Sequence, residues 1–212
     1  RDFIPRRYLL SEESEYFRGF LMQKHKNENL EEIKMKKNTT KNMVLSGLFI
    51  ALGLVLPQLF AHISGFGSRF LPMHIPVLLC GFVCGWPYGL FVGFVTPLLS
   101  GIIFGMPPIF PVAAVMAFEL AAYGFATGLL YRLFEKKNVF VYAALIISMI
   151  CGRIVWGIVS YAVYVGIRGS AFTWADFIAG AFVNAVPGII LQIVIIPVIV
   201  MALKRSNMIY ND

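Results

Sequence analysis

The chain has 212 residues, of which 58% are apolar and only 14% are charged, and its formal net charge is +7. A soluble domain carries about 25% charged residues to cover its surface. Here residues 1–42 hold ten Lys or Arg and seven Asp or Glu, whereas the other 170 residues hold only eight and four. The composition therefore excludes a soluble globular domain and predicts an integral membrane protein. A basic balance in such a chain is typical of Lys-rich and Arg-rich cytoplasmic loops rather than of nucleic-acid binding.

The first segment, residues 1–42, is expected to be a charged cytoplasmic tail that forms a solvated helix or is disordered. The chain begins with Arg1, and Met35 resembles a natural start, so we expect either that it begins inside a longer chain or that part of this tail does not belong to the natural protein. Residues 43–205 form the predicted membrane domain, and residues 206–212 a short cytoplasmic tail.

From Met43 onward the hydropathy is nearly continuous, and glycine, proline and charge interrupt it rather than long polar loops. At about 20 residues per crossing, a domain of this length accommodates six helices. The predicted fold class is an all-α bundle of six transmembrane helices. The predicted spans are 43–62, 71–85, 87–105, 110–132, 139–167 and 174–203.

The basic residues predict the orientation of these spans. If the N-terminus is cytoplasmic, fifteen Lys or Arg lie on that side, and only Arg69 and Arg168 lie on the other. The positive-inside rule then places both termini in the cytoplasm. The outward connections are 63–70, 106–109 and 168–173.

Cysteine and histidine positions argue against a metal or redox site. The three cysteines lie inside apolar runs, which is typical of small buried hydrophobes. His62 and His74 flank the first outer loop and are expected to cap the membrane boundary. Because no metal-ligand spacing and no phosphate-binding Gly-rich loop is present, the sequence predicts no metal and no cofactor.

Two ionisable residues stand out within the spans, because each costs about 2.5–3.5 kcal/mol at the bilayer centre. Glu119 lies about 12 Å below the outer end of its predicted span, and Arg153 about 21 Å below the outer end of the next, at about 1.5 Å per residue. Two interpretations stay open. The pair neutralises itself and joins two helices, or one or both residues line a solute site.

Helical spacing places further polar and aromatic residues near this pair. Arg153, Trp156, Ser160 and Tyr164 fall on one face of a helix, which suits a small amphiphilic solute. Asn184 and Gln192 form a second polar stripe, although amides also hold helices together. The candidate substrate-binding residues are Glu119, Tyr123, Arg153, Trp156, Ser160, Tyr164, Asn184 and Gln192.

Small residues recur at every fourth position in two places. One series comprises Gly81, Gly85, Gly89 and Gly93, and the other pairs Gly47 with Ala51. This spacing lets helices approach closely, which serves packing inside the bundle or docking against another membrane protein.

Four segments resemble the substrate-binding S component of energy-coupling factor (ECF) transporters. They are LPMHIPVLLCGF at 71–82, FELAAYG at 118–124, GRIV at 152–155 and NAVPG at 184–188. The likeness covers residues 36–205. It implies a six-helix bundle with both termini inside, in a bacterial cell membrane, that binds a vitamin or related micronutrient near the outer face.

The resemblance also implies a gate and partners. The loop 63–70 would cover the solute, with Gly65, Phe66 and Gly67 as its gating residues. The partners would be a membrane coupling protein and two cytoplasmic ATPases, so the chain itself is expected not to be an enzyme. Gly47 and Ala51 would dock the coupling protein, although the family usually has two alanines there.

The solute and two rival functions stay open. A stand-alone secondary transporter or a membrane scaffold without ATPase partners is the alternative. An Arg153 that Glu119 does not fully neutralise would favour a carboxylate-bearing solute, whereas a satisfied pair would suit a larger uncharged one. Pantothenate, a cobalamin precursor and a queuosine precursor all remain candidates.

Overall fold

The structure is a computed structural model, and the chain divides into two compact units, Arg1–Lys41 and Asn42–Asp212. The first unit is helical at residues 22–25 and again from residue 38. The functional description below concerns the second unit. The structure describes residues 22–25, 38–60, 70–134, 137–167, 169, 173–181 and 185–206.

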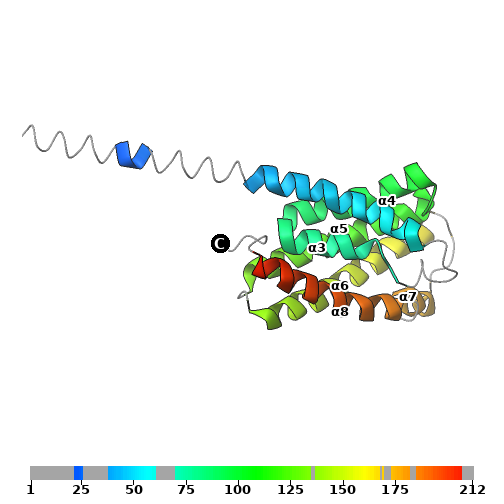
Figure 1. Cartoon of the computed structure of the whole chain (residues 1–212). Coiled ribbons are helices and arrows are strands. Elements are labelled where there is room, and N and C mark those ends of the chain that lie inside the picture. Colours follow the sequence, from blue (N-terminus) through cyan, green and yellow to red (C-terminus); the bar gives the residue numbers. More distant parts are fainter. Residues whose placement is uncertain are drawn as a thin grey trace, which may run out of the picture. The chain divides into compact units, whose positions relative to one another are not determined.

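The described part of the second unit is helical (Figure 1). Its elements are the helix Asn38–Phe60 from Asn42 onward, α3 (His74–Cys84), α4 (Trp86–Phe104), α5 (Ala114–Leu133), α6 (Asn138–Tyr161), α7 (Trp174–Ala181) and α8 (Val186–Arg205). A kinked turn with extended backbone at Phe110 precedes α5, and a π-helical turn, Ala162–Ile167, follows α6.

Five helices within the described residues are long and apolar enough to cross a membrane. Three of them, Trp86–Phe104, Ile109–Leu133 and Asn138–Ile167, match the predicted spans to within one residue at each end. The first, Asn38–Phe60, begins five residues earlier than predicted. The last is Val186–Arg205. These helices confirm an all-helical membrane protein, whereas the predicted count of six is not reached by this measure.

Two predicted spans differ from the structure. The second contains only the eleven-residue helix α3, about 16 Å long at 1.5 Å per residue, and ten of its residues are buried. A helix that is apolar on all sides belongs in the interior of a bundle, which is where α3 lies. The sixth prediction, one helix over 174–203, is wrong because α7 ends at Ala181 and α8 begins at Val186. Pro187 occupies the first turn of α8, where its missing N–H costs no hydrogen bond.

Glycines allow α4 and α5 to pack backbone against backbone. A Cβ atom on Gly89 would stand 2.5 Å from the Gly124 carbonyl oxygen, and one on Gly93 would collide with the Leu120 carbonyl. On α3, a Cβ atom on Gly81 would stand 2.7 Å from the same Gly124 oxygen. Of the two roles considered for this glycine series, packing inside the bundle and docking against another membrane protein, the structure therefore supports packing inside the bundle.

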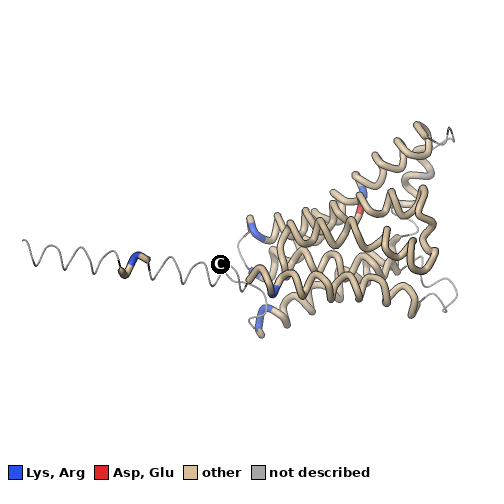
Figure 2. Tube along the Cα trace, turned by 90° about the horizontal axis from the view of Figure 1, so that it is seen from above, with Lys and Arg blue, Asp and Glu red and all other residues tan. Residues whose placement is uncertain are grey.

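The helices α4 and α5 run antiparallel, because Trp86, Gly89 and Gly93 along α4 meet Gly128, Gly124 and Leu120 of α5 in reverse order. At the other end of α5, the ring of Phe134 meets that of Phe140 at the start of α6. Basic residues gather at one end of the bundle, where α5 and α8 end and α6 begins (Figure 2). The described ones there are Arg132, Lys137, Lys204 and Arg205. Farther from this end, the acidic Glu119 of α5 lies beside the basic Arg153 of α6 (Figure 2).

Candidate functional site

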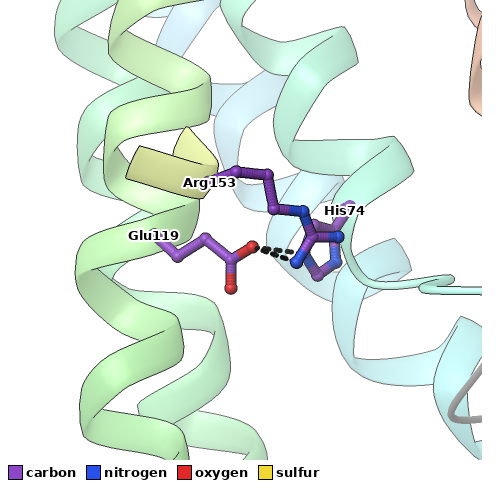
Figure 3. A network of polar contacts seen from close by, with 3 residues as sticks. All are labelled: His74, Glu119 and Arg153. Carbon is purple, nitrogen blue, oxygen red and sulfur yellow. Dashed lines mark ion pairs between the residues drawn. The ribbon is translucent and has the colours of Figure 1, made fainter. Parts of the chain in front are cut away.

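A buried cluster of three ionisable side chains lies at the junction of α3, α5 and α6 (Figure 3). Nη1 of Arg153 lies 2.9 Å from Oε1 of Glu119, and Nε2 of His74 lies 3.6 Å from the same oxygen. Glu119 and His74 are each 2% exposed and Arg153 is 6% exposed. Glu119 and Arg153 therefore form a direct ion pair, shielded from solvent.

The pair forms because both residues lie at the same height above the basic end of the bundle. Glu119 precedes Leu133, the end of α5, by fourteen residues, about 21 Å. Arg153 follows Asn138, the start of α6, by fifteen residues, about 22 Å. The predicted difference in depth of about 9 Å is wrong. The depths of Glu119 and Arg153 were counted from the outer ends of their spans. Those ends lie at different heights, because the π-helical turn extends the α6 segment farther outward than α5.

His74 belongs to this cluster and was missing from the predicted site. The sequence placed it at the membrane boundary, whereas the structure buries it at the first position of α3. Its backbone N–H donates to the Leu71 carbonyl at 3.0 Å, and Leu71 itself has a φ of 50°, which is unusual outside glycine. The sequence signal that could have identified His74 is its position at the start of a short, wholly apolar helix. Such a helix lies in the core, and its first residue is then buried as well.

Tyr123 completes the cluster from α5. Its ring meets the His74 ring edge-on at a centroid separation of 5.4 Å. Gly152, the neighbour of Arg153, leaves room for this ring, because a Cβ atom there would stand 2.5 Å from Cε1 of Tyr123. Tyr123 is thus held between α3 and α6.

We expect Gly152→Ala to weaken solute binding, because the added methyl group displaces the Tyr123 ring from His74 and Arg153. Overpacking of this kind costs about 1–3 kcal/mol of stability. Gly166→Ala is the matched control, since a Cβ atom on Gly166 has no heavy atom within 4 Å. Solute affinity and thermal unfolding of both variants in the same detergent check the prediction. Equal solute affinity in the two variants would contradict it.

Several buried polar atoms without a hydrogen bond belong to this cluster or to other residues of α6 and α8. Within the part of the chain that the structure describes, seven such atoms occur, and six belong to cluster residues or to two neighbours predicted for the site. They are both ring nitrogens of His74, Oε1 of Glu119, Nε of Arg153, Oγ of Ser160 and Nε2 of Gln192. Ser160 and Gln192 are 0% and 1% exposed. Oε1 of Glu119 and Nε2 of His74 still take part in the ion-pair contacts. Leaving the other groups unpaired costs about 1–3 kcal/mol each, so their presence needs a reason.

The remaining predicted residues lie in different surroundings. Trp156 is half-buried and packs on α7, where its ring centroid is 6.1 Å from that of Phe177. Tyr164 lies in the π-helical turn, so the stripe at α-helical spacing extends only to Ser160. Asn184 and the gating residues Gly65, Phe66 and Gly67 lie outside the described residues.

The structure describes no group of three or more His, Cys, Asp or Glu side chains able to hold a metal ion in the ranges given above. Cys80, Cys84 and Cys151 are not joined in disulfide bonds, and the first two are buried in α3.

The fold and the cluster together define a polytopic membrane protein with a buried cluster of ionisable side chains. Residues 41–200 match the family model described as ECF transporter, substrate-specific component. Since this match covers most of the sequence, the chain belongs to that family, whose members are transport subunits rather than enzymes. Comparisons with curated proteins and with solved structures found no match.

Proposed function

We propose that this chain is the solute-binding subunit of an ATP-driven importer, and that it captures a vitamin or related micronutrient near the outer face of a bacterial cell membrane. The carrying observation is that buried polar atoms of His74, Arg153, Ser160 and Gln192 lack hydrogen bonds in a chain of a substrate-specific transport family. An ion pair that only joined two helices would not explain why these other buried polar atoms lack hydrogen bonds.

The orientation in this proposal follows from charge. The basic end of the bundle faces the cytoplasm under the positive-inside rule, so Glu119 and Arg153 lie about 21 Å from that surface, in the outer half of a hydrocarbon core of about 30 Å. The chain crosses six times if α3 with its preceding segment, and α7 with α8, each make one crossing. Both termini are then cytoplasmic, and the loop 63–70 with Gly65, Phe66 and Gly67 covers the solute.

Thermal unfolding tests the capture of a solute. A ligand present at about 1,000 times its Kd stabilises the folded state by about 4 kcal/mol. We therefore expect at least one member of a panel of B vitamins and their precursors to raise the unfolding temperature of the purified protein. No response across the panel would contradict the proposal, and the alternative of a membrane scaffold would then be favoured.

Partner assembly supplies a separate prediction, based on the exposed face of the helix Asn38–Phe60. Gly47 and Ala51 are exposed, and a Cβ atom on Gly47 has open space around it. We expect Gly47→Leu to prevent co-purification with a membrane coupling protein and two ATPase subunits while solute binding persists. Ala162→Leu, at an exposed position outside this helix, is the control. Retained co-purification in Gly47→Leu would exclude this surface as the docking site.

A further inference from the structure

The ion pair of Glu119 and Arg153 leaves part of the guanidinium group unused. Its closest approach joins a single nitrogen, Nη1, to a single oxygen, Oε1. Buried arginine–carboxylate pairs with a structural role favour the bidentate form, in which two parallel hydrogen bonds use both ends of the fork. Here Nε of Arg153 is buried and has no hydrogen-bond partner among the described residues. The guanidinium therefore retains a donor for another acceptor.

The unused guanidinium nitrogen is a donor, because arginine carries five N–H donors and no acceptor. A neutral imidazole adds one donor and one acceptor. Glu119 is the only acidic residue in the sequences of α3, α4, α5, α6 and α8, and its Oε1 already contacts Arg153. An occupant that pairs with Nε of Arg153 must therefore supply an acceptor atom.

Charge balance narrows the class of occupant. Because Arg153 and Glu119 cancel, a cation would have to compete with Arg153 for Glu119. A phosphate would bring a charge of about −1.5 to −2, more than one guanidinium can balance. A carboxylate brings one negative charge and two planar acceptor oxygens that match the guanidinium geometry. With the carboxylate present, one more positive charge makes the cluster neutral.

His74 is placed to supply that positive charge. Its Nε2 lies 3.6 Å from Oε1 of Glu119, the oxygen that Arg153 also contacts and on the same side of the carboxylate, and both ring nitrogens lack a hydrogen bond (Figure 3). The titratable groups around it are Glu119 and Tyr123 from α5 and Arg153 from α6. The helix α4 carries only Tyr88 as a titratable residue, and α8 only Lys204 and Arg205 at its far end.

We infer that His74, Glu119 and Arg153 form a site for a carboxylate group of the transported solute, and that each solute enters together with one proton taken up by the His74–Glu119 pair. Arg153 binds the solute carboxylate through Nε, and the protonated pair of His74 and Glu119 keeps the four-group cluster neutral. This inference rests on the proposed function and adds to it the chemical class of the solute.

Matched acid and neutral compounds test the solute class. The probes are pantothenate with panthenol, nicotinate with nicotinamide, and biotin with biotinamide. We expect one acid to bind and its neutral partner to bind about 30-fold or more weakly, the penalty of removing one member of a buried charge pair. A neutral partner that binds as tightly as its acid would overturn the inference while the proposed function stands. No response to these probes or to the wider vitamin panel would overturn both.

Calorimetry in phosphate and in Tris buffer tests the proton, because the difference in binding enthalpy reports protons exchanged with the buffer. We expect uptake of about one proton per acid bound by the unmodified protein and none by Glu119→Gln or His74→Gln. Glu119→Gln removes the competing negative charge, so the acid should bind at least as tightly as to the unmodified protein. Absence of proton uptake in the unmodified protein, or loss of acid binding in a folded Glu119→Gln variant, would overturn the inference.

Discussion

Arg153→Met should lower the free energy of unfolding by about 3–5 kcal/mol, because it leaves the Glu119 carboxylate buried without its partner. That carboxylate is 2% exposed, and its Oε1 lies 2.9 Å from the guanidinium nitrogen that the variant removes. The variant should also lose solute binding. Thermal unfolding and solute titration in the same detergent measure the two effects.

The double variant Glu119→Gln, Arg153→Met separates these two effects. Replacing both charges of a buried pair by neutral side chains of similar volume is often neutral or stabilising, so most of the lost stability should return. Solute binding should stay absent, since the guanidinium is still missing. A double variant that regains binding would assign Arg153 a structural role alone, and a single variant as stable as the unmodified protein would contradict the importance of the pair.

The long helices were predictable because their sequence signal is local. An apolar run bounded by charge or glycine defines its own length, so the bounds of Trp86–Phe104, Ile109–Leu133 and Asn138–Ile167 follow closely from hydropathy. The break between α7 and α8 was not predicted, because the residues around Pro187 are apolar and hydropathy continues across them. A proline marks a possible helix start as well as a kink, and hydropathy alone does not distinguish them.

The candidate site was only partly predictable, because its geometry depends on contacts between distant segments. Rarity in a membrane span identified Glu119 and Arg153, and helical spacing linked Ser160 to Arg153. His74 escaped because its role depends on α3 lying in the centre of the bundle, with ten of eleven residues buried. That position is a property of packing with α4, α5 and α8, which no periodicity within 71–85 encodes.

The glycine series illustrates the same limit. Spacing of four residues indicates close helix approach but does not identify the neighbour. The structure identifies it as α5, where Gly124 and Gly128 present complementary gaps. A Cβ atom on Gly128 would collide with the backbone of Trp86, so the close approach extends along α4 from its first residue to Gly93.

Gly93→Ala should therefore be among the most damaging small substitutions in the bundle, since the added methyl group meets the rigid Leu120 backbone rather than a movable side chain. A Cβ atom there would also lie 2.7 Å from the backbone nitrogen of Ala121, so α4 must shift away from α5. Because Glu119 directly precedes Leu120, the shift should disturb the charged cluster as well.

We expect Gly93→Ala to lower the free energy of unfolding by about 3 kcal/mol, the upper range for overpacking, and to weaken solute binding. Gly47→Ala provides the matched control, because it makes the same chemical change in a helix at a position with open space. There the lower backbone entropy of alanine in the unfolded chain should raise stability by about 0.4–1 kcal/mol. Thermal unfolding of both variants in one detergent gives the comparison, and a Gly93→Ala variant as stable as Gly47→Ala would refute the close packing of α4 on α5.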